Sequence, residues 1–167
     1  IWFFQNVGKA IHVIDYYEQR NEGLPHFARI LEERGYLYGY HLAPHDIEHR
    51  ELGTGKSRLE TAYQLGINFR VCKKIPIEDG IHAAQMALSR CWFDYDNCEQ
   101  GLQALNQYHR AYNERTRSFR MSVVHDWSSH GADAFRYLAV GLEDNDRLQG
   151  GPPQNHAIME YSVFGHA

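Results

Sequence analysis

The sequence lacks a long apolar segment and a cysteine framework. No run approaches the roughly 18–20 apolar residues of a membrane span, and the four apolar residues at the start are too few for a signal-peptide core and have no basic flank before them. Cysteine occurs only as Cys72, Cys91 and Cys98, without a CxxC pair, so neither a disulfide framework nor a thiolate zinc site is indicated. We expect reduced thiols, no membrane and no secretion, as in a cytoplasmic protein.

The sequence also lacks an excess of positive charge. Lysine and arginine number 17 and acidic residues 21, which gives a net charge of −4 at pH 7. This balance excludes a strongly basic protein that coats DNA, but it does not exclude an enzyme with a local basic groove, because net charge does not report where charges lie. A length of 167 residues, 43% of them hydrophobic, is enough for one compact domain with its own core.

Core-like sequence stands at the very start of the chain. Residues 1–4 read Ile-Trp-Phe-Phe, with no methionine and no polar lead-in, and this start is typical of a fragment whose upstream part is missing. The apolar run 1–7 and the run 10–17, separated by Asn6 and Gly8, predict an antiparallel hairpin.

Helical and extended patterns alternate after this hairpin. Apolar spacing predicts helices at 24–34, 57–65, 77–91, 99–113 and 128–142, and shorter runs predict strands at 36–42 and 67–72. The order indicates an α/β fold with a mixed sheet, in which chemistry gathers at the ends of central strands. From residue 143 the composition becomes polar and rich in Gly and Pro, so 143–167 is expected to be a flexible C-terminal tail.

Two short motifs fit familiar sites poorly. Residues 52–57 (LGTGKS) suggest a phosphate loop, but Arg50 stands where the first glycine is required. His45 and His49 are spaced as in a zinc-peptidase helix, but Asp46 replaces the usual Glu, and Pro44 favours a junction between strand and loop. The loop that contains the LGTGKS motif carries Arg50, Lys56 and Arg58. These cations could contact a phosphate backbone or could simply be solvated.

Three further residues form a candidate site for a hard cation. Asp46 directly follows a short predicted strand. An Asp at this position could be a ligand of a divalent metal or could cap the turn. His130 and Asp133 are three residues apart on the last predicted helix and share a face. Carboxylates from two elements with one imidazole suit Mg²⁺ or Mn²⁺, whereas a helix cap with a helix-dipole acid is the simpler reading.

These motifs resemble a known family. Residues 41–46 (HLAPHD), 50–58 (RELGTGKSR) and 125–138 (HDWSSHGADAFRYL) are similar to the C-terminal nuclease domain of phage terminase large subunits. The resemblance covers roughly residues 1–142 and implies an RNase H-like mixed sheet flanked by helices. It implies a metal-dependent endonuclease that cuts concatemeric double-stranded DNA during genome packaging in the cytoplasm of a bacterial host.

The resemblance also assigns roles to residues. Asp46 would be the second and Asp133 the third of three acids that hold two Mg²⁺ or Mn²⁺ ions, with His130 close to a metal. The first acid of the family lies on a central first strand upstream of Ile1, so that strand and acid are missing here, and Asp15 is not a substitute. The expected partners are double-stranded DNA, a terminase small subunit, a portal protein and an upstream ATPase motor domain.

Other functions stay open at this point. Another RNase H-like nuclease, of the resolvase or transposase type, would share the acids and differ in substrate. Because the first acid is absent, the chain could also be inactive, or a non-catalytic module that docks on DNA or a portal.

Overall fold

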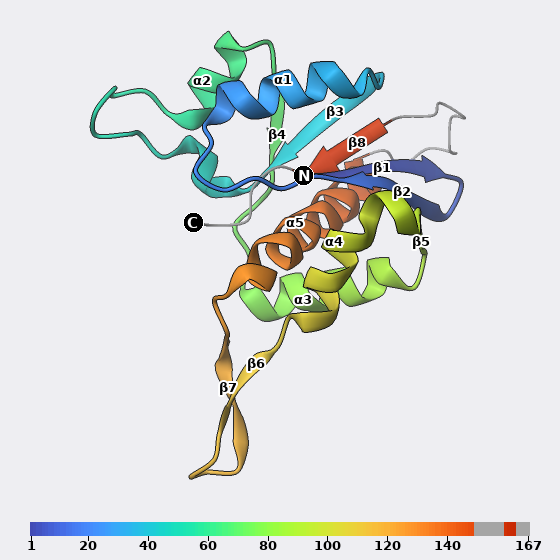
Figure 1. Cartoon of the computed structure of the whole chain (residues 1–167), viewed down its shortest axis with the longest axis vertical. Helices are drawn as coiled ribbons and strands as arrows, with labels where there is room; N and C mark the ends of the chain where they lie inside the picture. The colour runs from blue at the N-terminus through green and yellow to red at the C-terminus, as the bar shows by residue number, and fades with distance from the viewer. Residues whose placement is uncertain (149–158, 163–167) are drawn as a thin grey trace.

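A mixed sheet with helices on both sides forms the body of the protein (Figure 1). The computed structural model describes residues 1–148 and 159–162. The predicted α/β class with a mixed sheet is therefore confirmed. The strands are β1 Trp2–Val7, β2 Ala10–Tyr16, β3 Tyr38–Ala43, β4 Phe69–Val71, β5 Cys91–Phe93, β6 Arg110–Asn113, β7 Ser118–Val123 and β8 Met159–Ser162. The helices are α1 Leu24–Arg34, the 3-10 helix η1 His45–Glu48, α2 Arg58–Gln64, α3 Ile77–Leu88, α4 Tyr95–Gln107 and α5 Trp127–Leu148.

The main sheet is ordered β4-β3-β8-β1-β2-β5. β1 runs antiparallel to both β2 and β8, whereas β3 runs parallel to both β4 and β8. Strand β8 lies between β1 and β3. Both neighbours thereby gain a hydrogen-bonding partner for backbone groups that would otherwise be buried without one.

The segment 143–167 differs from the expected flexible tail where it is described. Residues 143–148 continue α5, and 159–162 form β8. A four-residue strand is too short to show an alternating pattern, so the sequence alone gave no sign of it. The remainder of that segment lies outside the described residues.

Alternating side chains of β1 enter two separate cores. Trp2 and Phe4 join the cluster beneath α3, α4 and α5, whereas Ile1 and Phe3 join the cluster beneath α1 and α2. This follows from the two-residue period of a strand. The apolar start of the chain is therefore the centre of the protein, buried on both faces.

Helix α5 packs closely against the sheet and against α3 and α4. Trp2 Nε1 donates a hydrogen bond to the carbonyl of Gly131, at 2.9 Å, which fixes the start of α5 over β1. Glycine permits this approach, since a Cβ at Gly131 would lie 2.7 Å from the Tyr16 hydroxyl. No described helix is both long enough and apolar enough to cross a membrane.

A second, two-stranded sheet projects from the body. Strands β6 and β7 pair antiparallel, and Figure 1 shows their hairpin extending away from α3 and α4. The sequence predicted helix over 99–113, but α4 ends at Gln107 and Tyr108 is extended. The hairpin depends on pairing with residues 118–123, which a local helical pattern does not report.

Candidate functional site

Asp46 lies where strand β3 ends. Pro44 is extended and begins the 3-10 helix η1, which contains His45 and Asp46, so the predicted junction of strand and loop is present. A 3-10 helix has three residues per turn, so positions four apart do not share a face. His45 and His49 therefore do not form the helical pair that a zinc peptidase requires.

Asp133 lies on α5 and is buried, with only 5% of the residue exposed. Arg136 Nε donates to Asp133 Oδ1 at 3.3 Å, and the Tyr108 hydroxyl donates to the same oxygen at 3.4 Å. Arg136 is equally buried, so the two residues form an ion pair inside the protein. Burial raises the pKa of Tyr108 to about 12, with the charge of Asp133 adding to the rise. Tyr108 is thus a neutral hydrogen-bond donor.

Tyr137 connects the two elements that carry the predicted acids. Its hydroxyl makes a 3.2 Å hydrogen bond with His45 Nδ1, which connects α5 to η1. Burial raises the pKa of Tyr137, the charges of Asp46 and Asp133 raise it further, and Arg136 opposes them. The hydrogen bond to His45 connects the helix that carries Asp133 to the segment that carries Asp46, although these segments lie far apart in the chain.

The guanidinium of Arg136 completes this arrangement. Its carbon lies 4.6 Å from the centroid of the Tyr137 ring, in a cation–π contact. Gly80 of α3 provides the space, because a Cβ there would lie 2.8 Å from the Arg136 side chain. Both Arg136 and Tyr137 belong to the motif at residues 125–138, but the sequence pattern indicated no role for either. Their roles depend on contacts with distant residues, which spacing alone could not reveal.

The donor atoms at this site suit a hard divalent cation in kind. Carboxylate oxygens are the preferred ligands of Mg²⁺, and His130 lies one turn before Asp133 on α5. Within residues 1–148 and 159–162, however, no group of three or more His, Cys, Asp or Glu side chains is arranged to hold a metal ion. Asp46, Asp133 and His130 would thus need a further carboxylate to form the expected two-metal centre.

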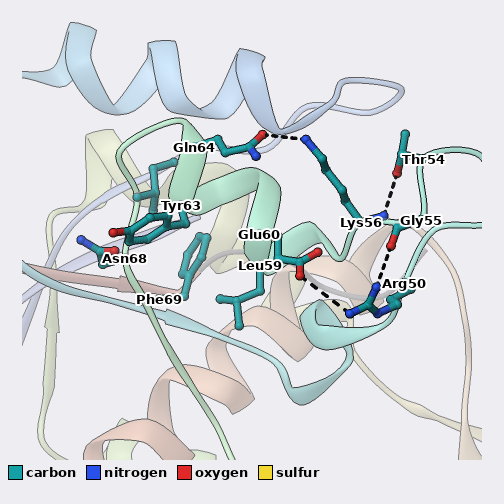
Figure 2. Close-up of a pocket in the computed structure, with 11 residues that line it drawn as sticks. Arg50, Thr54, Gly55, Lys56, Leu59, Glu60, Tyr63, Gln64, Asn68 and Phe69 are labelled. Carbon is teal, nitrogen blue, oxygen red and sulfur yellow. Dashed lines mark hydrogen bonds and ion pairs between the residues drawn. The ribbon is translucent and has the colours of Figure 1, made fainter.

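Two of the three predicted DNA-contacting cations, Arg50 and Lys56, line a separate cleft (Figure 2). Arg50 donates to the Gly55 carbonyl at 3.1 Å and lies 3.9 Å from Glu60, and Lys56 donates to Gln64 at 3.4 Å. Arg58, just outside the cleft, lies 3.6 Å from Glu51. Each cation already has a partner within the chain. The open cleft beside them has a volume of about 690 Å³ and includes the side chains of Leu59, Tyr63 and Phe69.

The same region does not form a phosphate loop. The loop follows η1 and not a strand, and Arg50 bridges to Ser57 in antiparallel fashion. The Ser57 hydroxyl accepts from the Glu60 amide while the Glu60 carboxylate accepts from the Ser57 amide. Ser57 is therefore the N-cap of α2 in a capping box, and this role explains the serine of the LGTGKS motif.

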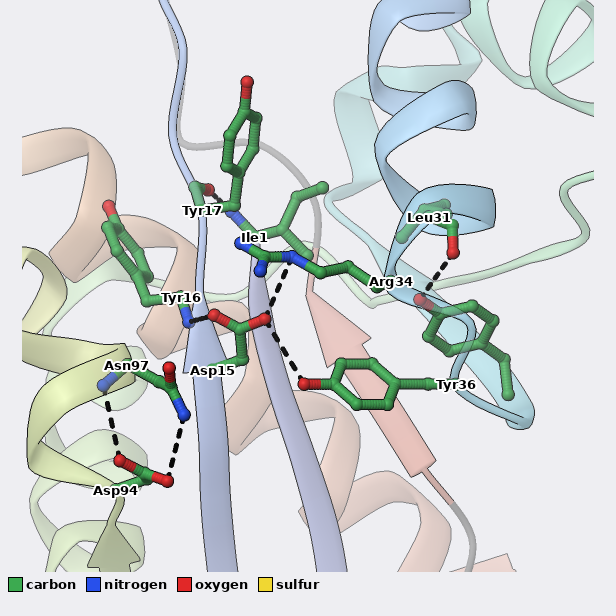
Figure 3. Close-up of polar contacts among 10 residues, drawn as sticks. Ile1, Asp15, Tyr16, Tyr17, Leu31, Arg34, Tyr36, Asp94 and Asn97 are labelled. Atoms are coloured by element: carbon green, nitrogen blue, oxygen red, sulfur yellow. Dashed lines mark hydrogen bonds and ion pairs between the residues drawn. The ribbon is translucent and has the colours of Figure 1, made fainter.

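Asp15 lies in a separate structural cluster (Figure 3). It pairs in register with Phe3, whose side chain belongs to the core on the α1 side, whereas Asp133 lies on α5. Arg34 Nε lies 3.1 Å from its carboxylate, and the Tyr16 amide donates to it at 2.8 Å. Burial raises the pKa of Asp15, and Arg34 opposes that rise. The ion pair connects β2 to α1.

Comparison with known proteins adds no relative. No family model, no curated protein and no solved structure matches this chain. The functional assignment therefore depends on the residues of the site and their arrangement.

Proposed function

We propose that this chain is the nuclease domain of a phage DNA-packaging terminase, a divalent-metal-dependent endonuclease that cuts concatemeric double-stranded DNA. The observation that carries the proposal is the hydrogen bond between Tyr137 and His45, which connects the helix that carries Asp133 to the segment that carries Asp46. In this proposal the domain is RNase H-like, Asp46 follows a strand of its sheet, and Asp133 lies on its last helix.

Bound Mg²⁺ or Mn²⁺ would activate water and stabilise the leaving oxygen of the cleaved phosphodiester. Asp46 and Asp133 would hold the ions, together with His130 and a further carboxylate. Arg136 orients the Asp133 carboxylate through their 3.3 Å contact. Tyr137 and Tyr108 stay neutral at physiological pH, so they can donate hydrogen bonds without adding negative charge beside the carboxylates.

The mixed sheet is of the class that the proposal requires. Its strand beside β1 is β8, from the far end of the chain, whereas the terminase resemblance calls for a strand that precedes β1. In the proposed setting, an upstream ATPase motor domain, a terminase small subunit and a portal protein cooperate with this domain in the bacterial cytoplasm.

The test is nicking of a supercoiled plasmid in Mn²⁺ by the full-length protein that contains this segment. Asp46→Asn and Asp133→Asn should each slow nicking by at least about a hundredfold, since loss of a metal ligand weakens both metal binding and the chemistry. Asp79→Asn is the matched control, because Asp79 is an exposed carboxylate in the first turn of α3.

Asp133 is buried beside Arg136, so its variant requires a thermal melt to confirm folding. Asp46 is only half-buried, so Asp46→Asn tests the site at a less buried position, with the same thermal melt as its folding control. If both variants nick the plasmid as fast as the parent, the assignment of the two acids is wrong.

One observation favours a second candidate. The described residues include no complete metal-ligand group, as a module that docks on DNA or a portal without cutting would show. Calorimetric titration with Mn²⁺ separates the two functions. The nuclease should bind Mn²⁺ in a manner that depends on Asp133, whereas the docking module should show no such binding.

A further inference from the structure

The β6–β7 hairpin, residues 110–123, differs in charge from the rest of the protein. It carries four arginines against one glutamate, in a chain whose net charge is −4. Figure 1 shows that it projects from the body, so this positive charge is held away from the acidic remainder. Local concentration of charge of this kind is the usual electrostatic footprint of a nucleic-acid contact.

Two arginines at the tip are exposed and available. Arg110, at the base, is already paired with Glu78. Within the part of the chain that the structure describes, neither Arg115 nor Arg117 forms an ion pair with an acidic side chain, and both are exposed. They differ in this respect from Arg50 and Arg58, whose guanidinium groups face acids of their own loop and helix.

The tip of the hairpin has a defined geometry. The Asn113 side chain accepts hydrogen bonds from the backbone amides of Arg115 and Thr116, at 3.1 and 3.4 Å. Arg117 has a φ of 49°, a left-handed conformation that a non-glycine residue adopts only where the surrounding turn imposes it. The two cations are thus presented on a shaped turn.

An exposed aromatic pair lies on the ribbon behind these cations. Tyr112 and Phe119 face each other across the two strands, with ring centroids 5.2 Å apart in an edge-to-face arrangement. The residues are 53% and 68% exposed. Arginines beside exposed aromatic rings provide two kinds of contact with nucleic acids. The arginines pair with phosphates, and the rings contact sugars and bases.

The base of the hairpin lies against the candidate site. Val124 donates a backbone hydrogen bond to His109 at 3.0 Å, which closes the hairpin at its root. Tyr108, the residue before this closure, donates to Asp133. The ribbon therefore starts two residues after Tyr108, whose side chain contacts the proposed metal ligand Asp133.

We infer that the β6–β7 hairpin is an arm that binds duplex DNA beside the candidate site. A strand of six residues is about 20 Å long, and the major groove admits a two-stranded ribbon. Arg115 and Arg117 contact phosphates, and Tyr112 with Phe119 contacts the walls of the groove. The choice of duplex over single-stranded DNA rests on the proposed function, whereas binding by the arm does not require cleavage.

The test is fluorescence anisotropy with a random-sequence 30-base-pair duplex, in EDTA so that nothing is cut, between 50 and 200 mM salt. Each lost phosphate contact lowers the slope of log affinity against log salt by about 0.9. The parent should therefore lose about tenfold more affinity over this range than the double variant Arg115→Gln/Arg117→Gln. Tyr112→Ala/Phe119→Ala should weaken binding without changing the slope.

The matched control is Lys9→Gln/Arg20→Gln, which removes two other exposed cations, one of them at the tip of the β1–β2 hairpin. It should bind as the parent does. An equal salt slope for the parent and the arginine variant would overturn the inference, as would tighter binding to a single-stranded probe that depends on the same arginines.

The outcomes also separate this inference from the proposed function. If DNA binding depends on the arm but the protein does not cut plasmid, the arm is supported and the nuclease assignment is wrong. If the protein nicks plasmid through Asp46 and Asp133 but its DNA binding does not depend on the arm, the nuclease is supported and the arm is wrong.

Discussion

At the scale of single residues, several buried titratable groups are held in their neutral forms. His41 on β3 shows this most simply, because burial lowers its pKa to about 4. Its ring packs against Tyr38 and Phe69, with centroids 5.3 and 6.0 Å away. An imidazole in such surroundings is disfavoured in its charged form.

This burial predicts a pH-dependent stability. Below about pH 6.5 the unfolded chain takes up a proton on His41, whereas the folded protein takes it up only near pH 4. The free energy of unfolding should therefore fall as the pH is lowered from 7 to 4.5. His41→Gln should show a smaller fall, because glutamine does not titrate. Urea denaturation at several pH values measures the difference.

The control for this prediction is His82→Gln, since His82 is exposed on α3. Its stability should follow pH as the parent does. An identical loss of stability in the parent and in His41→Gln would contradict the pKa that burial is expected to impose.

Sequence reasoning identified part of the candidate site at this scale. It predicted Asp46 at a strand end and Asp133 on the last helix, and both lie there. It missed Tyr108 and Tyr137, because a tyrosine becomes part of a site through partners distant in the chain. A motif gives residue types and their spacing in the sequence, but not which side chains contact one another in the fold.

At the scale of elements, local patterns predicted helices better than short strands. The apolar stripes gave α1, α3 and α5 nearly at their observed starts, since a helix pattern repeats over many residues. The hairpin β6–β7 and the strands β5 and β8 were missed. Each is three to six residues long, and each exists because a distant segment pairs with it or packs on it.

The packing of α4 on β1 gives a second prediction. A Cβ at Gly101 would lie 2.3 Å from the Trp2 ring and 2.7 Å from the Tyr16 ring. Gly101→Ala should lower the free energy of unfolding by about 1–3 kcal/mol through overpacking, even though alanine favours a helix by about 1 kcal/mol. Urea denaturation is the measurement.

Gly53→Ala provides the comparison, because nothing lies within 4 Å of a Cβ at that loop position. It should change stability by less than about 0.5 kcal/mol. Equal stability of the two variants would mean that α4 does not approach Trp2 as closely as the structure has it.

At the scale of the whole molecule, one sheet separates two cores, and the elements that carry Asp46 and Asp133 are joined by the Tyr137–His45 hydrogen bond. The carboxyl end of β3 continues into η1, and α5 packs across the other side of the same strand. The position of Asp46 relative to Asp133 therefore depends on the formed sheet and on its strand order.

The central strand β8 therefore gives the last prediction. It pairs with β1 and β3 through residues 159–162, where Phe4 and Tyr40 lie opposite Glu160 in the register. Truncation after Leu148 removes this strand and leaves backbone groups of both neighbours without partners. Each lost hydrogen bond costs about 1 kcal/mol, so amide exchange in β1 and β3 should accelerate by about tenfold or more, while exchange in the β6–β7 hairpin stays unchanged. Truncation after Ser162 retains β8 and should leave exchange in β1 and β3 at the parent rate. If the shorter chain exchanges as slowly as the longer one in both strands, β8 does not hold the centre of the sheet.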